Sequence, residues 1–265
     1  MSLATQERRG AVALVVYANP PVGTMTAAGA NEMLAAVQTA ADDPDARVIV
    51  ITGGMPGIFI RHYDVGELSA ASDRLAQSSP PPQPASGARQ GGGFGALTDL
   101  IAAAPKPVIA AINGLCMGGG FELSLACDLR IAGKDVTSIG LPETRVGIFP
   151  GGGGTQRLPR VIGEAKALEF ILRGQVVDGP RAGELGLVHE VVDDPLARAL
   201  EIAAELASRG PEGLAHAKRL IRAALGRPLA EGLADERQSF GAVMRTASAR
   251  EGLRAARPPA QLQDL

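Results

Sequence analysis

The chain has 265 residues and is rich in glycine, with 34, but poor in aromatic residues, with six phenylalanines, two tyrosines and no tryptophan. Hydrophobic residues make up 46% of the chain and charged residues 20%, a composition that excludes disorder over most of its length. The formal net charge is −2 and long like-charge blocks are absent, which argues against a nucleic-acid partner.

The N-terminal sequence MSLATQERRGAVALVVY lacks the apolar region and cleavage site of a secretory signal. No run of about 18 apolar residues occurs either, so we expect no membrane span and a cytoplasmic location. Cys116 and Cys127 lie in no metal-ligand pattern and are expected to be small buried side chains. His-x-x-x-His, Cys-x-x-Cys and clustered aspartate patterns are absent, so the sequence predicts no bound metal.

Strand and helix patterns alternate through the first half of the chain. Short β-branched, apolar runs predict buried strands, and apolar residues at helical spacing predict helices. In chain order these are a strand at 11–17, a helix at 26–40, a strand at 47–52, a helix at 96–104, a strand at 107–112, a helix at 119–126 and a strand at 129–132. The alternation predicts an α/β fold in which helices cover a sheet.

Residues 78–93, SSPPPQPASGARQGGG, interrupt this alternation. The segment has no apolar anchor and cannot offset the entropy of ordering it, so it is expected to be a mobile loop. It is either a lid over a site or an inert insertion, and its composition alone favours the inert alternative.

From about residue 153 the pattern becomes mainly helical, with a single predicted strand at 187–192. The helices predicted here are 155–163, 164–173, 180–185, 197–209, 211–224 and 229–246. We therefore expect a sheet-based core of residues 1–195 and a helical C-terminal region of residues 196–265.

The segment INGLCMGGGFELSLACD, residues 112–128, carries the strongest functional signal. Gly118, Gly119 and Gly120 are expected to precede a helix that contains Glu122. Free amides at a helix N-terminus, with the positive end of the helix dipole behind them, can bind an oxyanion. The alternative is a glycine turn that only permits tight strand–helix packing, and glycines by themselves favour it. The spacings of a dinucleotide fingerprint and of a P-loop are absent.

A second acid, Glu143, follows in GLPETRVGIFPGGGGTQRLPR and is expected on a loop. Two carboxylates delivered to one cavity can serve as acid and base when burial or mutual repulsion separates their pKa values. The alternative is that Glu143 is an ordinary surface residue, because a single glutamate on a surface is more often exposed to solvent than catalytic.

The segment GIFIRHYDVGEL, residues 57–68, follows the strand at 47–52 and could supply a second backbone donor for an oxyanion hole. His62 has no visible serine, cysteine or metal partner, so it is interpreted, like His189 and His216, as a structural or surface residue. A G-x-S-x-G nucleophile elbow is absent, which excludes the lipase type of serine hydrolase.

Four segments together resemble the enoyl-CoA hydratase/isomerase (crotonase) superfamily, and the resemblance extends over about residues 10–225. They are VIVITGG at 48–54, KPVIAAINGLCMGGGFELSLACDLRIAG at 106–133, LPETRVGIFPGGGGTQRLPRVIG at 141–163 and ELGLVHEVV at 184–192. The resemblance implies a spiral of ββα units that carries the thioester site within residues 1–195. It also implies that the helical region of residues 196–265 assembles the chain into a homotrimer or homohexamer.

The implied activity is that of an enoyl-CoA hydratase acting on a trans-2-enoyl-CoA. Coenzyme A would be part of the substrate, and no separate cofactor is expected. The same fold hosts several reactions, so double-bond isomerisation, decarboxylation and thioester hydrolysis stay open, as does a non-catalytic acyl-CoA binding protein.

Carried over by position, the resemblance implies that the backbone amides of Tyr63 and Gly119 bind the thioester oxygen. Glu122 would deprotonate the water that adds at Cβ, and Glu143 would deliver a proton to Cα. The positions expected to line the coenzyme A, acyl and water sites are Arg61, His62, Asp64, Gly118, Gly120 and Gly151.

The chain departs from the family pattern at three places. It has Arg61-His62-Tyr63-Asp64 where relatives have Ala-Gly-Ala-Asp or similar, so the bulk of His62 and Tyr63 is expected to reshape the substrate channel. The C-terminal segment lacks the family's aromatic, lysine-rich ending, and Arg254 or Arg257 are candidates to replace its contact with coenzyme A. The 78–93 loop lies where relatives have an acyl-pocket segment, which shifts its interpretation toward a functional role.

Overall fold

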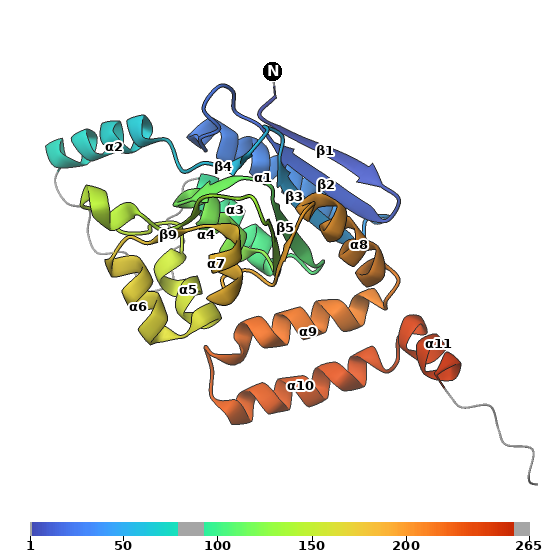
Figure 1. The fold of residues 1–265 in the computed structure, drawn as a ribbon. Helices are drawn as coiled ribbons and strands as arrows, with labels where there is room; N and C mark the ends of the chain where they lie inside the picture. The colour runs from blue at the N-terminus through green and yellow to red at the C-terminus, as the bar shows by residue number, and fades with distance from the viewer. Residues whose placement is uncertain (1, 79–92, 257–265) are drawn as a thin grey trace, which may run out of the picture.

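The computed structural model describes residues 2–78 and 93–256. The segment 79–92, which is nearly all of the predicted loop, and Arg257 therefore lie outside the described residues. Two sheets form the middle of the N-terminal part, with helices packed against them, and the last helices of the chain extend away from this part (Figure 1).

The larger sheet has six strands in the order β1-β2-β3-β5-β7-β10. All neighbours pair in parallel except β1 and β2, which are antiparallel. The strands are β1 (Ala4–Arg9), β2 (Val12–Tyr17), β3 (Val48–Gly53), β5 (Val108–Ile112), β7 (Leu129–Gly133) and β10 (Glu190–Val192). The smaller sheet, in the order β4-β6-β8-β9, contains β4 (Ile58–Ile60), β6 (Leu115–Met117), β8 (Ile139–Gly140) and β9 (Val176–Val177).

The helices fill the intervals between strands and make up the C-terminal part. In the first half they are α1 (Ala27–Asp42), α2 (Val65–Gln77), α3 (Gly93–Ala103) and α4 (Gly119–Ala126). A 3₁₀ turn, η1 (Glu143–Val146), is followed by α5 (Gly154–Ile162), α6 (Glu164–Leu172), α7 (Gly179–Glu184), α8 (Pro195–Ala207), α9 (Pro211–Ala224), α10 (Leu229–Val243) and α11 (Ala247–Ala255).

Each face of the larger sheet is covered by a different set of helices. Buried residues of β2, β3, β5 and β7 pack on one face against Ala199 and Ala203 of α8. The opposite face contributes to the main core, together with α1, α3 and α4. This covering explains why the central strands are apolar on both faces, and it confirms the predicted α/β class.

Most predicted elements are present within a few residues of their expected bounds, and several were not predicted. The edge strand β1 was missed because its sequence, ATQERR, is polar and only Ala4 is buried. The α2 helix was missed because it buries no residue, although Asp64 caps it by accepting the amide of Glu67 at 3.0 Å. The strands of the smaller sheet have two or three residues each and carry no periodic signal.

Three expectations about the functional segments need correction. The α4 helix begins at Gly119, as predicted from its helical pattern, so the expectation that all three glycines precede it is wrong and only Gly118 does. Glu143 lies in the 3₁₀ turn η1 and not in an irregular loop. The predicted strand at 187–192 is extended only over its last three residues, β10.

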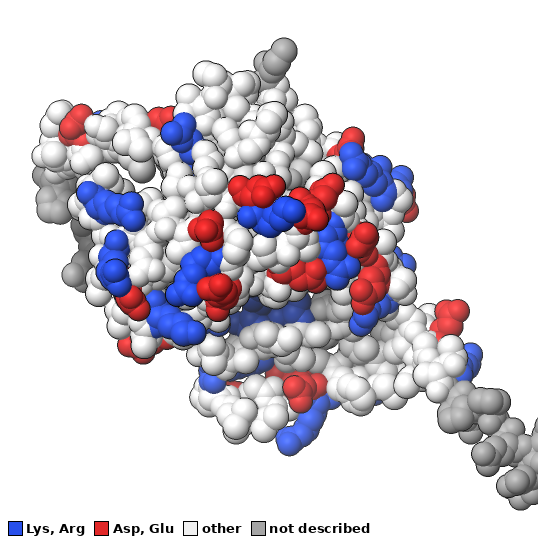
Figure 2. Space-filling model, viewed as in Figure 1, with Lys and Arg blue, Asp and Glu red and all other residues white. Residues whose placement is uncertain are grey.

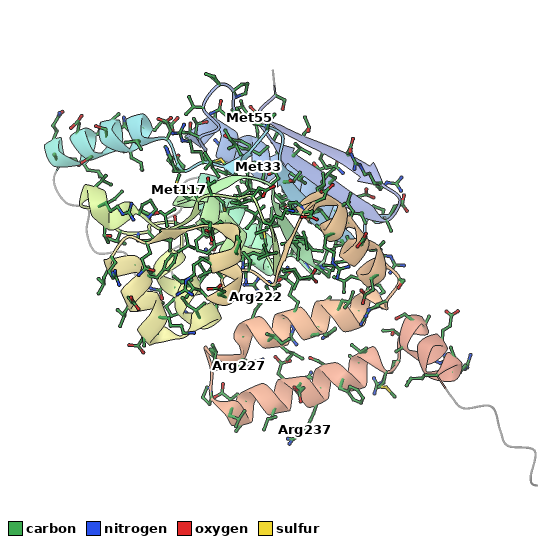
Figure 3. The ribbon with its side chains drawn as sticks, in the orientation of Figure 1. Met33, Met55, Met117, Arg222, Arg227 and Arg237 are labelled. Carbon is green, nitrogen blue, oxygen red and sulfur yellow. The ribbon has the colours of Figure 1, made fainter. Side chains whose placement is uncertain are left out.

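The α9 helix is joined to the sheet region by two cations. Lys218 Nζ lies 2.8 Å from the Asp128 carboxylate and also donates to the carbonyl of Ile101, at the end of α3. Arg222 donates to the other Asp128 oxygen and to the carbonyl of Ala126 at the end of α4, each at 2.8 Å. Figure 3 shows Arg222 on the side of α9 that faces the rest of the chain. The division between residues 195 and 196 stays a prediction.

On the face drawn in Figure 2, lysine and arginine side chains alternate with aspartate and glutamate and form no large patch of one sign. Within residues 2–78 and 93–256, none of the helices is both long enough and apolar enough to cross a membrane.

Candidate active site

The N-terminus of α4 lies at the end of the short strand β6 and beside the segment that follows β4. Gly118 is the N-cap and has a φ of +48°, a conformation that favours glycine. Gly120 packs so closely on β4 that a Cβ there would lie 2.1 Å from the carbonyl oxygen of Ile60. The two glycines allow this helix start to approach the backbone of the neighbouring strand directly.

Two backbone amides meet at this point. Met25 bonds to the residues on either side of Tyr63, donating to the His62 carbonyl at 2.8 Å and accepting the Asp64 amide at 2.7 Å. The Tyr63 amide therefore points away from Met25, toward the other edge of its segment. A Cβ placed on Gly119 would lie 3.5 Å from the Tyr63 nitrogen. Neither the Tyr63 amide nor the Gly119 amide donates a backbone hydrogen bond within the described residues. Two donors on different elements are thus available for one acceptor.

Glu122 is buried at the first turn of α4, with 4% of its surface exposed. Its Oε1 accepts two backbone amides, from Gly152 at 2.7 Å and from Gly154 at 2.8 Å. Burial raises the pKa of this carboxyl above its usual value, while the two amides and the positive charge of Arg157 oppose the rise. The carboxylate is fixed in position by backbone donors that are about thirty residues away in the chain.

Glu143 reaches the same region from η1. A Cβ placed on Gly118 would lie 3.1 Å from its Oε1, and its Oε2 is buried without a hydrogen-bond partner among the described residues. Burial raises the pKa of Glu143 to about 7, and the nearby charge of Glu122 contributes to the rise. A carboxyl group with this pKa exchanges its proton close to neutral pH, as an acid catalyst should.

Residues 151–154, which we call the glycine turn, include positions closely packed against other residues and one position that is open. A Cβ at Gly152 would lie 2.4 Å from the Phe94 ring and 2.7 Å from Glu122 Oε2, and one at Gly154 would lie 2.8 Å from Pro150. Gly151 is exposed, and a Cβ there would meet nothing closer than 4.0 Å. The sequence-based selection of Gly151 thus overlooked Gly152 and Gly154, whose amides contact Glu122. Its own role at the water site stays a prediction.

An aromatic pair lies beside the amide donors. The rings of Tyr63 and Phe94 meet edge to face, with centroids 5.7 Å apart and an interplanar angle of 79°. Phe94 also lies next to Gly119, where an added Cβ would be 3.4 Å from its ring. Sequence reasoning did not find Phe94, because nothing in its local sequence distinguishes it from a core residue of α3.

The remaining predicted site residues lie on the segment after β4. The Arg61 side chain is exposed, and the His62 ring contacts the Tyr63 carbonyl through Nδ1 at 2.7 Å. Asp64 caps α2 and accepts the hydroxyl of Thr24 at 3.1 Å, so both of its oxygens have partners within the protein. Their proposed contacts with coenzyme A stay predictions.

The part of the chain that the structure describes contains no group of three or more His, Cys, Asp or Glu side chains placed to bind a metal ion. Two carboxyl groups and two available amide donors lie together here, an arrangement that can supply an acid, a base and donors for a developing negative charge on oxygen.

Comparison with known proteins identifies the family of this chain. Residues 7–260 match the family model described as enoyl-CoA hydratase/isomerase. The mitochondrial methylglutaconyl-CoA hydratase of Rattus norvegicus is 35% identical over 263 residues, covering 96% of this chain and 80% of that protein. The putative enoyl-CoA hydratase/isomerase YngF of Bacillus subtilis is 49% identical over 158 residues, which are 59% of this chain and 60% of YngF.

Solved structures are similar over nearly the whole chain. The crystal structure of an enoyl-CoA hydratase from Bacillus anthracis has a TM-score of 0.84 and 33% sequence identity, covering 96% of this chain and 95% of that one. An enoyl-CoA hydratase structure from Thermoplasma volcanium has a TM-score of 0.84 at 28% identity, covering 97% and 98% of the two chains. The expected crotonase-like fold is confirmed.

Proposed function

Because the chain belongs to the enoyl-CoA hydratase/isomerase family of the crotonase superfamily, we propose that it adds water across the double bond of a trans-2-enoyl-CoA. The observation that carries the proposal is the pair of carboxyl groups beside two available backbone amides: Glu122, which is buried, and Glu143, which is partly buried with its Oε2 atom enclosed. An acyl-CoA thioester supplies the matching chemistry, since its carbonyl oxygen gains negative charge when a nucleophile attacks Cβ.

The amides of Tyr63 and Gly119 receive that oxygen. As the water oxygen bonds to Cβ, the π electrons of the double bond move toward the thioester carbonyl and form an enolate. Donors that are already oriented stabilise this charge more than they stabilise the neutral substrate, and the N-terminus of α4 adds its dipole.

Glu122 acts as the base. Its Oε1 is occupied by the amides of Gly152 and Gly154, so Oε2 is the oxygen left to bind the attacking water. The carboxylate takes one proton from that water while the resulting hydroxide bonds to Cβ. The fixed orientation of the carboxylate aligns the water before the reaction.

Glu143 acts as the acid. It donates its proton to Cα of the enolate, which collapses to the 3-hydroxyacyl-CoA, and the proton taken up by Glu122 returns through solvent to reset the pair. The raised pKa of Glu143 supports this role, because a carboxyl group with an ordinary pKa would carry almost no proton at neutral pH.

A panel of thioesters tests the proposal. Crotonyl-CoA, a 3-enoyl-CoA, malonyl-CoA, a saturated acyl-CoA and an aryl-CoA are incubated with the protein, and loss of the conjugated enoyl absorbance measures hydration. We expect hydration of crotonyl-CoA, with or without a chelator, since no metal or separate cofactor is invoked. Turnover of only the 3-enoyl-CoA would indicate an isomerase instead. Turnover of malonyl-CoA or of the saturated thioester would indicate a decarboxylase or a hydrolase, and tight binding without turnover a binding protein.

We propose a homotrimer or homohexamer as the assembly. Large apolar side chains on α9, α10 and the turn between them are more than half exposed in the single chain: Ile221, Leu225, Leu229 and Phe240. Covering such side chains is the usual role of a subunit interface. Light scattering on the purified protein distinguishes a trimer, a hexamer and a monomer.

A further inference from the structure

Arg157 is a largely buried cation to which the proposed chemistry assigns no role. It lies in the first turn of α5 with 18% of its side chain exposed. Its Nη1 donates to the carbonyl oxygen of Gly152 at 2.9 Å, and its Nη2 lies 3.5 Å from the carboxylate of Asp99 on α3. The guanidinium therefore spans from the glycine turn to a second helix.

The glycine turn is shaped around this guanidinium. Gly153 has a φ of +109°, and a Cβ at this position would lie 2.1 Å from Arg157 Nη1. The peptide carbonyl of Gly152 points to the arginine, while the amides of Gly152 and Gly154 point to Glu122. The same turn thus contacts an arginine through its oxygen and a carboxylate through its nitrogens.

We propose that Arg157 is a positioning residue for Glu122, fixing the glycine turn between the Gly152 carbonyl and Asp99 so that two amides orient the carboxylate. This inference rests on the proposed hydration, in which Glu122 is the base. Arginine suits the task because its planar fork reaches two acceptors at once, whereas a lysine ammonium is a point charge on a flexible stem.

The charges around Glu122 agree with this role. The charged groups that face it from packed elements are Arg157 of α5, paired with Asp99 of α3, and Glu143 of η1. Arg157 lowers the pKa of Glu122, whereas burial of the carboxyl raises it. Loss of the arginine therefore moves the Glu122 titration to higher pH and leaves less of the ionised base.

The test compares Arg157→Gln with Arg160→Gln, a matched change at an exposed arginine on the same helix. We expect Arg157→Gln to lower kcat about 10-fold to 100-fold with little change in KM, since misplacement of the base affects the chemical step. We also expect its Glu122 carboxyl, followed by carbon NMR in labelled protein without substrate, to titrate at higher pH than in Arg160→Gln. The NMR titration does not depend on activity, so failure of the proposed hydration leaves it decisive.

Equal kcat in the two variants, or an equal Glu122 titration, overturns the inference, because a merely structural arginine would not move the titration. If Arg157→Gln fails to fold, Arg157→Lys replaces it and Arg160→Lys becomes the control. The lysine keeps the charge but cannot reach both acceptors, so we expect a lower kcat with the Glu122 titration nearly unchanged. A kcat equal to that of Arg160→Lys overturns the inference.

Discussion

The amide nitrogen of Gly152 lies 2.7 Å from Oε1 of Glu122, although the two residues are thirty positions apart in the chain. This contact, with that of the Gly154 amide, occupies Oε1 of a buried carboxyl group and leaves Oε2 without a hydrogen-bond partner among the described residues. It joins the start of α4 to the glycine turn before α5.

Replacing either acid by its amide should remove most of the activity. Glu122→Gln keeps an oxygen that can accept the Gly152 and Gly154 amides, and Glu143→Gln keeps the volume of its side chain, so both preserve the geometry. We expect each variant to lose about 10²-fold or more in kcat, because neither amide can exchange the required proton. Stopped assays with crotonyl-CoA measure the loss. Unimpaired hydration by either variant would contradict the assigned roles.

The rate of hydration should fall as pH rises above neutral. Glu143 has a pKa raised to about 7 and must carry its proton in order to donate it to Cα. Above this pH the acid is progressively ionised, so kcat/KM of the wild-type protein should decrease, and the residual rate of Glu143→Gln should not show this decrease. A pH profile of kcat/KM checks the prediction, and a wild-type rate that keeps rising through pH 8 would count against it.

Replacing Gly152 by alanine should lower kcat much more than replacing its neighbour Gly151. A Cβ at Gly152 would lie 2.4 Å from Phe94 and 2.7 Å from Glu122 Oε2, so Gly152→Ala must displace one or both side chains. We expect kcat to fall about 10-fold to 100-fold. A Cβ at Gly151 would meet nothing closer than 4.0 Å within the chain, so Gly151→Ala should leave Glu122 in place and cost much less in kcat than Gly152→Ala. Similar kcat values in the two variants would show that the glycine turn does not position Glu122.

The stability of the protein should depend on pH through Glu143. Its pKa is about 7 in the folded chain, against an ordinary value of 4.5, so between these values the folded state binds more protons than the unfolded state. Wild-type stability is therefore lost as pH rises through this window, and Glu143→Gln removes that loss. We expect the Tm of the variant, relative to wild type, to increase from pH 4.5 to pH 7. Thermal unfolding across this range checks it, and a constant difference in Tm would be the contrary result.

Local sequence patterns were sufficient to predict the fold class and the helix that carries Glu122, the proposed base. The alternation of apolar strands and amphipathic helices predicts an α/β fold, because side-chain periodicity is set within a few residues. The helix at 119–126 was predicted with the bounds that the structure shows for α4. Glu122 and Glu143 were selected as candidates from the glycine segments and the family resemblance, and the structure places both beside the α4 N-terminus.

Other features depend on contacts between distant segments. The smaller sheet pairs strands of two or three residues from four separate parts of the chain, and strands this short have no period of their own. Gly152 and Gly154, whose amides contact Glu122 from thirty or more positions away, were not distinguished from Gly151. The four residues of the turn are all glycine, so the sequence cannot tell them apart. They differ only in how close each lies to Glu122 and Phe94 in the folded chain.

The sequence by itself determined the central strands of the larger sheet, most of the helices, the glycine-flanked start of α4 and the two candidate acids, since each is encoded in a few consecutive residues. Tertiary structure alone decided which backbone amides contact Glu122, how far burial raises the pKa of Glu143, and that Arg157 spans from Gly152 to Asp99. Hydrogen bonds across thirty or more residues and the exclusion of water from a carboxyl group both depend on how the elements pack, which no local pattern specifies.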